Sequence, residues 1–405
     1  MSAGDETAVS AAAAGQADLA QVPLRVSTLE LFFDLVFAFT LTQLAAVLDT
    51  GLDIAAGGQV LLIFGLLWWM YEGYAWLTNA RPPVHPAERI LLLTGMAGFL
   101  VVGLAIPHGF GSDGVTLGAG YLVVVVVHAS LYYRVNANII RVAPFNIASA
   151  LLVLIAGVAG GPARYPLWAA ALVIQLGSPL IVHPRNLFEL RPAHLVERHS
   201  ALLIVALGES VAAIGIGAAT RDGHAAGTPA ALTVSSVLGL ALAAALWWII
   251  FGGRDEEHTE QVLTAASSAR RTSLALSALF YGNVPVLLGL VAMAAGVQEA
   301  IARAGRAGGW SLASGGLADA AVLAAGAALF LAGDVAIRRV LRTGPVALRV
   351  AGAVAALATV AAGVTIGPGA QLALLTAVLA VMLAAERYRD APEPGPPGPA
   401  GRIEP

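Results

Sequence analysis

The stretch "VSTLELFFDLVFAFTLTQLAAVL" (residues 26–48) is apolar enough to cross a membrane, yet it carries Glu30, Asp34 and Gln43. A helix needs about 20 mostly apolar residues to span the hydrocarbon core of a bilayer. An ionised carboxylate near the centre of such a helix costs about 2.5–3.5 kcal/mol to insert. Glu30 and Asp34 are four residues apart, so they share one helix face. The stretch therefore predicts a transmembrane helix whose acidic face meets other helices or water.

The composition of the whole chain agrees with this prediction. Of its 405 residues, 58% are hydrophobic and only 12% are charged, whereas soluble domains carry about 25% charged residues. The formal net charge of −3 argues against a basic surface for nucleic acid. The chain has no cysteine, which excludes disulfides and thiolate chemistry, and all 22 basic residues are arginine. These features predict an all-α, polytopic integral membrane protein whose main partner is the lipid bilayer.

Twelve apolar stretches of spanning length follow one another along the chain. We expect them at 29–48, 57–77, 89–106, 117–134, 143–160, 165–183, 199–218, 229–252, 271–296, 317–337, 346–365 and 368–386. They define a transmembrane domain over 29–387. A polar, mobile tail is expected at 1–28, and a disordered Pro/Gly-rich tail at 388–405.

The arginines test this count and give an orientation. With twelve spans and the N-terminus inside, eighteen of the 22 arginines fall on the cytoplasmic side. The other four are Arg164, Arg221, Arg303 and Arg306. Loops rich in arginine stay in the cytoplasm. We therefore expect a multi-pass protein of the cytoplasmic (inner) membrane with both termini in the cytoplasm.

A faint internal repeat divides the spans into two sets of six. Placing Glu30 on Glu197 also places "LAAV" (44–47) on "VAAI" (211–214) without a gap. In the following spans, "LWWMY" (67–71) resembles "LWWII" (246–250). Halves of six spans share one orientation, which is the parallel-repeat arrangement of one class of secondary transporters. The expected repeats are 29–183 and 194–387.

A first polar cluster is expected in the cytoplasmic half of the membrane. Glu30 and Asp34 lie early in the first span, Glu72 late in the second and His128 late in the fourth. Ionisable residues inside a membrane usually face the bundle interior and often mark a pathway for protons or solutes. Two interpretations stay open: a pocket that takes up and releases protons, or ion pairs with Arg134, Arg141 or Arg198 that hold helices together.

A second cluster lies in "HLVERHSALLIVALGES" (194–210). Glu197, Arg198 and His199 mark the cytoplasmic entrance of the seventh span, and Glu209 lies near its middle. Gly208 beside it, and Gly215 and Gly217 beyond it, are expected to allow close helix approach. Glu209 is a candidate proton carrier, and the alternative is a protonated carboxyl group bonded to a neighbouring helix.

The remaining polar features favour structural roles. Asp334 and Arg338 are four residues apart and are expected to form an ion pair. The acidic run "DEEHTE" (255–260) is expected to be a solvated cytoplasmic loop and not a metal site. Walker A, G-x-S-x-G and HExxH motifs are missing from the sequence. We therefore predict no cofactor, no metal and no enzymatic activity.

Two of the quoted stretches resemble the signatures of a known family. "ELFFDLVFAFTLTQLA" (30–45) and "HLVERHSALLIVALGES" (194–210) are similar to the two signatures of the bacterial low temperature requirement A (LtrA) family. The matching positions are Glu30, Phe33, Asp34, Glu197, Arg198, Gly208 and Glu209, and Ser200 stands where a glycine or another small residue is expected. The resemblance implies a multi-pass membrane protein connected with growth at low temperature, and it implies no particular reaction.

The sequence favours a secondary transporter or permease for an unknown small solute, with proton coupling as a further expectation. Protonation of Asp34 or Glu209 would remove a buried charge and shift the balance between inward-open and outward-open states. One alternative is a non-catalytic protein that supports or senses the bilayer in the cold. Another is an intramembrane enzyme that acts on lipid. The sequence specifies neither the substrate nor the oligomeric state.

Overall fold

The computed structural model describes residues 25–49, 54–133, 139–182, 190–219, 229–253, 255–306 and 316–390, and every secondary-structure element in these ranges is a helix. The first half comprises α2 (Thr28–Asp49), α3 (Ile54–Ala80), α4 (Pro86–Ala105), η1 (Ile106–His108), α5 (Gly114–Tyr133), α6 (Ile139–Ala159) and α7 (Arg164–Val182). The second half comprises α8 (Pro192–Ala219), α9 (Pro229–Phe251), α10 (Asp255–Ala265), α11 (Ser268–Ala275), η2 (Leu276–Tyr281), α12 (Gly282–Arg306), α13 (Leu317–Leu341), α14 (Ala347–Ala358), α15 (Val360–Thr365) and α16 (Pro368–Asp390).

Each of the twelve expected spans corresponds to a helix or a continuous run of helices. Within the described ranges, eleven are long and apolar enough to cross a membrane. The expected span at 165–183 is α7, a further helix of 19 residues. Several spans are composite: α4 continues into η1, α11, η2 and α12 form one run, and α14 continues into α15. The protein is an all-α multi-pass membrane protein, as predicted. Residues 1–24 and 391–405 of the expected tails lie outside the described ranges.

Local sequence signals explain where several helices begin and end. Ser27 and Glu30 form a capping box: the Ser27 Oγ accepts the Glu30 N–H at 3.3 Å, and the Glu30 Oε2 accepts the Ser27 N–H at 2.9 Å. Proline is the first residue of α4, α8, α9 and α16, where its missing N–H costs no helical hydrogen bond. Between α6 and α7, Gly160 and Gly161 adopt φ angles of 61° and 55°, the left-handed conformation that glycine reaches most easily.

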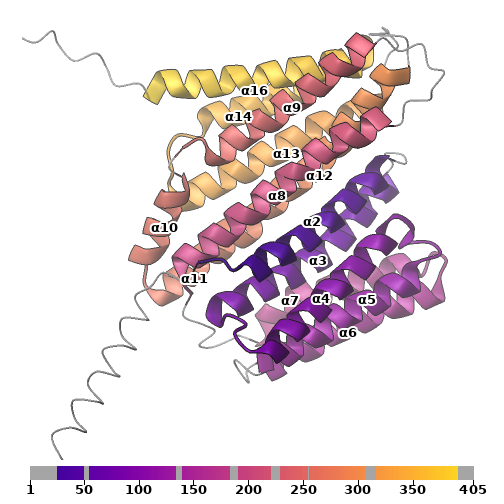
Figure 1. Cartoon of the computed structure of the whole chain (residues 1–405), viewed down its shortest axis with the longest axis vertical. Coiled ribbons are helices and arrows are strands. Elements are labelled where there is room, and N and C mark those ends of the chain that lie inside the picture. The colour runs from indigo at the N-terminus through magenta and orange to yellow at the C-terminus, as the bar shows by residue number, and fades with distance from the viewer. Residues whose placement is uncertain are drawn as a thin grey trace, which may run out of the picture.

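The two halves lie side by side (Figure 1). They meet where α2 packs against α8 and α12, and where α3 packs against α8. The outward faces carry large exposed apolar side chains such as Val123, Ile155, Val237 and Val381. A surface of this kind suits contact with lipid tails.

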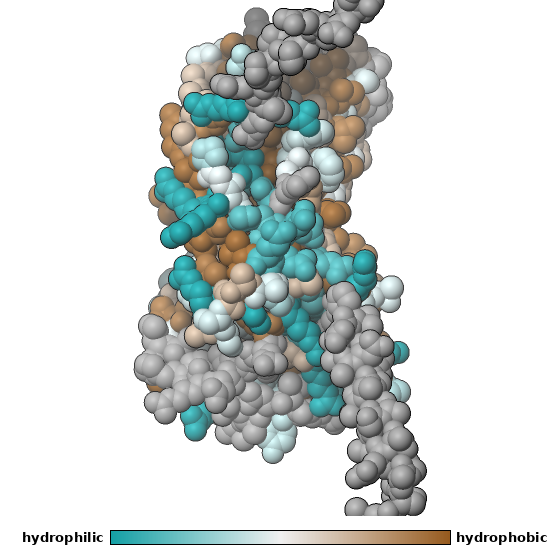
Figure 2. Space-filling model, turned by 90° about the vertical axis from the view of Figure 1, so that its left-hand side faces the viewer, coloured by the Kyte–Doolittle hydropathy of each residue, from teal (hydrophilic) through white to brown (hydrophobic). Residues whose placement is uncertain are grey.

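One end of the bundle carries the helices α10 and α11 (Figure 1), and we call it the α10 end. Hydrophilic residues gather on the face seen in Figure 2, which is the side of the molecule where α10 and α11 lie. The starts of α2 and α8 lie together at this end, because the Glu197 carboxylate of α8 accepts the Val26 N–H at 3.1 Å just before α2 begins.

The expectation of a solvated loop at 255–260 is wrong, because these residues form the first turns of α10. Three acidic residues in the first turn stabilise the helix through its dipole. Thr259 and Leu263, four residues apart, are buried on one face of α10. The helix α10 packs against α8. The acidic run suggested solvation, but its charges and its spacing of buried residues also suit a short amphipathic helix at the membrane surface.

Candidate functional site

The guanidinium group of Arg198 is the centre of a buried network between the two halves. Its Nη1 donates to the Glu30 Oε1 at 2.8 Å and to the Thr78 Oγ1 at 3.1 Å, and its Nη2 donates to the Asp34 Oδ1 at 3.0 Å. Arg198, Glu30 and Asp34 are each at most 1% exposed. A single arginine on α8 therefore binds both carboxylates of α2 and a hydroxyl of α3.

Two aromatic rings complete the surroundings of Arg198. Its Cζ lies 5.7 Å from the ring centroid of Phe33 and 5.8 Å from that of Tyr71, within the range of cation–π attraction. The Tyr71 hydroxyl also donates to the Asp34 Oδ1 at 2.8 Å. One carboxylate oxygen of Asp34 thus accepts two hydrogen bonds from two different helices.

His194 extends the network towards the end of α3. Its Nδ1 lies 3.2 Å from the Asn79 Nδ2, which can only donate. The His194 Nδ1 is therefore an acceptor, and its Nε2 carries the proton directed at the Glu30 Oε1, 3.2 Å away. Asn79 is fixed in turn by the backbone of Arg191. The Asn79 Oδ1 accepts the Arg191 N–H at 3.0 Å, and the Asn79 Nδ2 donates to the Arg191 carbonyl at 2.9 Å.

Glu72 and His199 form a second buried pair beside the first. The His199 Nε2 lies 2.8 Å from the Glu72 Oε1, and the His199 Nδ1 lies 2.8 Å from the Leu195 carbonyl. A carbonyl oxygen can only accept, so the His199 Nδ1 must carry a proton. The bond to Glu72 needs a second proton, which belongs either to the imidazole or to the carboxyl group. The other Glu72 oxygen accepts the Trp76 indole N–H at 3.0 Å. In this arrangement one proton lies between the two side chains.

Two buried atoms of the network have no hydrogen-bond partner among the described residues. They are the Asp34 Oδ2 and the Arg198 Nε. Buried polar atoms are nearly always satisfied by protein or by ordered water. An unfilled acceptor on a buried carboxylate is a position where a proton or a water molecule can bind.

Glu209 lies deeper along the same interface. Its Oε2 accepts a hydrogen bond from the Thr42 hydroxyl of α2, so it links the two halves, and its side chain is half-buried. In the alignment that places Glu30 on Glu197, Thr42 and Glu209 are equivalent positions. The expected close approach at Gly208 and Gly215 is wrong, because no heavy atom lies within 4 Å of a Cβ built at either position. Gly217 does lie against the α12 backbone at Gln298.

Other sequence-predicted residues lie apart from Arg198. His128 packs against the rings of Tyr74 and Tyr132, with centroids 5.1 and 5.4 Å away. In the part of the chain that the structure describes, His128 makes no hydrogen bond or ion pair with the network. Of the alternative arginine partners, Arg134 lies outside the described residues and Arg141 is exposed.

Asp334 and Arg338 form the expected ion pair, at 3.1 Å. Arg338 also binds Asp255 of α10. Asp334 binds Arg349 at 3.1 Å, and Arg349 binds Glu386 at 2.6 Å. This second charge network ties α10, α13, α14 and α16 together at the α10 end.

Sequence reasoning missed several members of the buried network: Tyr71, Trp76, Thr78, Asn79 and His194. A signal for two of them was available, because Glu72, Trp76 and Asn79 follow an i, i+4, i+7 spacing and therefore share one face of α3. Within the described residues, no group of three or more His, Asp and Glu side chains could hold a metal ion.

Fold and site together define a class: a multi-pass helical membrane protein with a buried acid–base network between the first and second halves of its helical bundle. The comparisons with known proteins give the family. Residues 25–384 match the family described as Bacterial low temperature requirement A protein (LtrA), and the chain belongs to this family. It is also similar to a protein of Rhizobium meliloti (strain 1021) described as uncharacterized, with 26% identity over 327 residues that cover 77% of this chain and 76% of the relative.

Proposed function

We propose that this LtrA protein is a secondary transporter for a small solute, and not an enzyme. The observation that carries the proposal is the Arg198 network, in which each charged contact joins α2 or α3 of the first half to α8 of the second. In transporters built from two halves, the substrate path opens and closes at the interface between them. Breaking and remaking this network would open and close the interface at the α10 end.

The helix contacts support two equivalent halves. In each half, the first helix contacts the second and the third, the third contacts the fourth, the fourth the fifth, the fifth the last, and the second the last. Glycines mark the same close approach in both halves: Gly98 lies against the Gly120 carbonyl, and Gly289 against the Gly326 carbonyl. A parallel repeat of this kind suits rocking of one half against the other about a central site.

We place the protein in the cytoplasmic membrane with the α10 end facing the cytoplasm. The support is the arginine asymmetry of the sequence, since cytoplasmic loops are enriched in arginine. Arg191, Arg271 and Arg338, which belong to the arginine-rich side, all take part in contacts at the α10 end.

Proton coupling follows from the chemistry of the interface. Separation of the halves would leave Glu30 and Asp34 without their arginine, which is costly for buried carboxylates. Uptake of a proton at the unfilled Asp34 Oδ2 would remove one of these charges before the halves separate. The shared proton of Glu72 and His199 offers a second carrier. Proton binding would thereby favour one of two interface states.

The test uses single cysteines, because the natural chain has none. Ala38 and Ala45 flank Thr42 on the face of α2 that meets Glu209 of α8, and both are buried. A transporter predicts that Ala45→Cys is labelled by an impermeant maleimide from outside, and that Ala38→Cys is labelled in inverted vesicles. A rigid bilayer-supporting protein predicts that neither cysteine is labelled.

Two further variants control the labelling experiment. Ile54→Cys, 97% exposed at the start of α3, must be labelled from outside, and Ala171→Cys, buried within α7, must stay unlabelled. Absence of label at both interface cysteines, with Ile54→Cys labelled, would refute the transporter and favour the non-catalytic alternative. Label at Ala171→Cys would show that the bundle is disrupted, and the same variants would then be tested in native membranes.

A further inference from the structure

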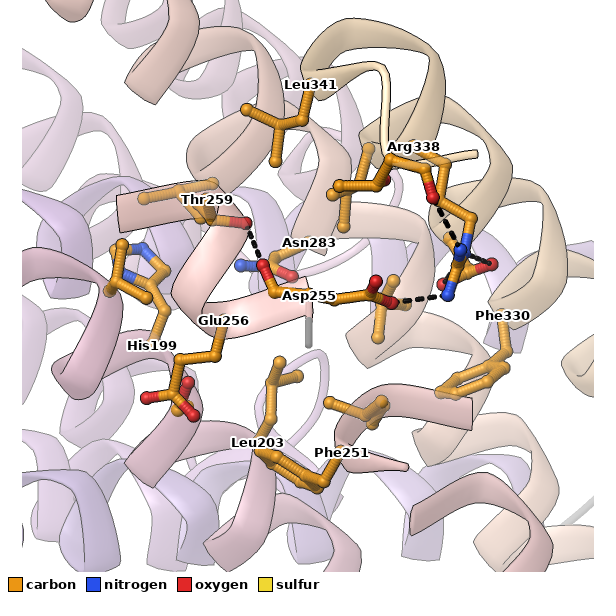
Figure 3. Close-up of a pocket in the computed structure, with 18 residues that line it drawn as sticks. His199, Leu203, Phe251, Asp255, Glu256, Thr259, Asn283, Phe330, Arg338 and Leu341 are labelled. Carbon is orange, nitrogen blue, oxygen red and sulfur yellow. Dashed lines mark hydrogen bonds and ion pairs between the residues drawn. The ribbon is translucent and has the colours of Figure 1, made fainter. Parts of the chain in front are cut away.

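A largely apolar pocket with a few polar side chains lies beside the Arg198 network, within the second half. It is a pocket of about 100 Å³ at the α10 end, bounded by α8, α9, α12 and α13 and covered by α10 (Figure 3). His199 lines it, and the same side chain binds Glu72 of the network. The pocket therefore touches the interface between the halves without being part of it.

Asn283, in the first turn of α12, supplies an unused polar group. It is 2% exposed, lines the pocket (Figure 3) and forms no side-chain hydrogen bond with the described residues. Its amide atoms are not among the fully buried unpartnered atoms of the described residues, so the amide is open to the pocket. A bound molecule with a hydrogen-bonding group would satisfy it.

The charges of the pocket select the sign of such a molecule. Each nitrogen of the Arg338 guanidinium donates a hydrogen bond, to Asp334, to Asp255 and to the Thr343 carbonyl. Two of these partners are carboxylates, which compensate the charge of Arg338 and disfavour the binding of an anion. Glu256, an exposed side chain on the first turn of α10, lines the pocket and has no ion-pair or hydrogen-bond partner among the described residues. Among the described lining residues the unbalanced charge is negative, so this lining favours a cation.

The rest of the lining limits the size and character of the cation. Leu203, Phe251 and Phe330 present apolar surface to the space (Figure 3). A cavity of about 150 Å³ can hold one benzene molecule, so this smaller pocket suits a solute of about five non-hydrogen atoms.

We propose that this pocket binds a small aliphatic ammonium ion, with its charge near Glu256 and its chain against the apolar wall. That the bound ion is the transported solute rests on the proposed function above. Binding next to His199 would give the solute direct contact with the Glu72–His199 pair, and α10 would close over it.

The corresponding space in the first half is filled. Ser200 of the pocket aligns with Phe33 when Glu197 is placed on Glu30. The Phe33 ring is 1% exposed and packs against Tyr74 and Phe99, with centroids 5.0 and 5.3 Å away. A small residue in the second half thus leaves open the space that aromatic rings occupy in the first.

Cysteine chemistry tests the charge of the pocket directly. In purified Ser200→Cys protein, modification rates are compared for a cationic aminoethyl and an anionic sulfonatoethyl methanethiosulfonate, each divided by its rate with a free thiol. We expect the cationic reagent to be favoured about tenfold, equivalent to about 1.4 kcal/mol. Adding Glu256→Gln should abolish most of this preference. Adding Glu257→Gln should preserve it, because Glu257 is an acid on the same turn, exposed like Glu256, that does not line the pocket.

Protection by ligands completes the test. Butylammonium should slow modification of Ser200→Cys by a neutral reagent, whereas butanol and butyrate should not. Equal rates for the two charged reagents, no reaction with either, or equal protection by all three ligands would overturn the proposal. These results are independent of the labelling of Ala38→Cys and Ala45→Cys. If the interface cysteines are labelled but Ser200→Cys shows no charge preference, the ligand site is refuted and the transporter proposal stands. If Ser200→Cys shows the charge preference but the interface cysteines are not labelled, the ligand site stands and the transporter proposal is refuted.

Discussion

Replacement of Arg198 by methionine should destabilise the protein far more than replacement of any exposed arginine. Methionine keeps much of the side-chain length but leaves Glu30, Asp34 and Thr78 without their shared donor. Removal of one partner from a buried ion pair costs about 3–5 kcal/mol, because the other charge stays buried and uncompensated. Two carboxylates lose their partner here, so we expect a loss in the upper part of that range.

Arg303 provides a matched control. It also binds two carboxylates, those of Glu299 and Asp319, but its side chain is 34% exposed. Ion pairs that water can reach contribute about 0–1 kcal/mol, so Arg303→Met should change the free energy of unfolding by no more than that. Both variants would be compared by titration with dodecyl sulfate in mixed micelles at a fixed lipid ratio.

A triple variant separates charge from packing. Combining Arg198→Met with Glu30→Gln and Asp34→Asn removes all three charges together, and neutral replacement of a whole buried ion network is often tolerated. We expect it to recover most of the stability lost in Arg198→Met. Equal stability of Arg198→Met and Arg303→Met would refute the buried ionic network. A triple variant no better than Arg198→Met would show that packing, and not charge, explains the loss.

Three further changes have expected outcomes in the same unfolding assay or by hydrogen exchange. Gly157→Ala should lower the free energy of unfolding by about 1–3 kcal/mol through overpacking, since its Cβ would lie 2.3 Å from the backbone of α5. Gly208→Ala, with open space around its Cβ, should leave the free energy of unfolding unchanged or raise it. Thr42→Val should cost about 1–3 kcal/mol, because it leaves the Glu209 carboxylate at the interface without its donor. Asp255→Asn should speed amide exchange in α10 alone, because it weakens the bond that ties this helix to α13; unchanged exchange would mean that packing alone holds α10.

The positions of the spans could be predicted from sequence because hydropathy is a local property. A stretch of about twenty apolar residues can be recognised without knowledge of its contacts, and polar or Pro/Gly breaks separate each stretch from the next. Membrane depth was predictable for the same reason, which is why Glu30, Asp34 and Glu72 were expected at one level.

Contacts between helices could not be predicted in this way. Depth does not specify which face of a helix meets which neighbour, so His128 was expected with Glu30 although its helix turns it towards Tyr74 and Tyr132. Arg198 was one of three candidate partners for the acids, and nothing in the sequence ranked it above the others. The pocket had no sequence signal, because its lining is scattered over five helices.

The pair of carboxylates in the first span is explained by the geometry of one guanidinium group. Glu30 and Asp34, one turn apart, bind different terminal nitrogens of Arg198, and Glu30 also completes the capping box of α2. A purely structural clamp needs no more than this, and a buried ion pair adds little stability over apolar packing. A clamp has no use for the unfilled Asp34 Oδ2, and the proton in the Glu72–His199 bond, which a clamp would also use, is one that can transfer between the two partners. Both suit an interface that must exchange protons in order to open, and this is the physical reason for preferring a transporter to a rigid support of the bilayer.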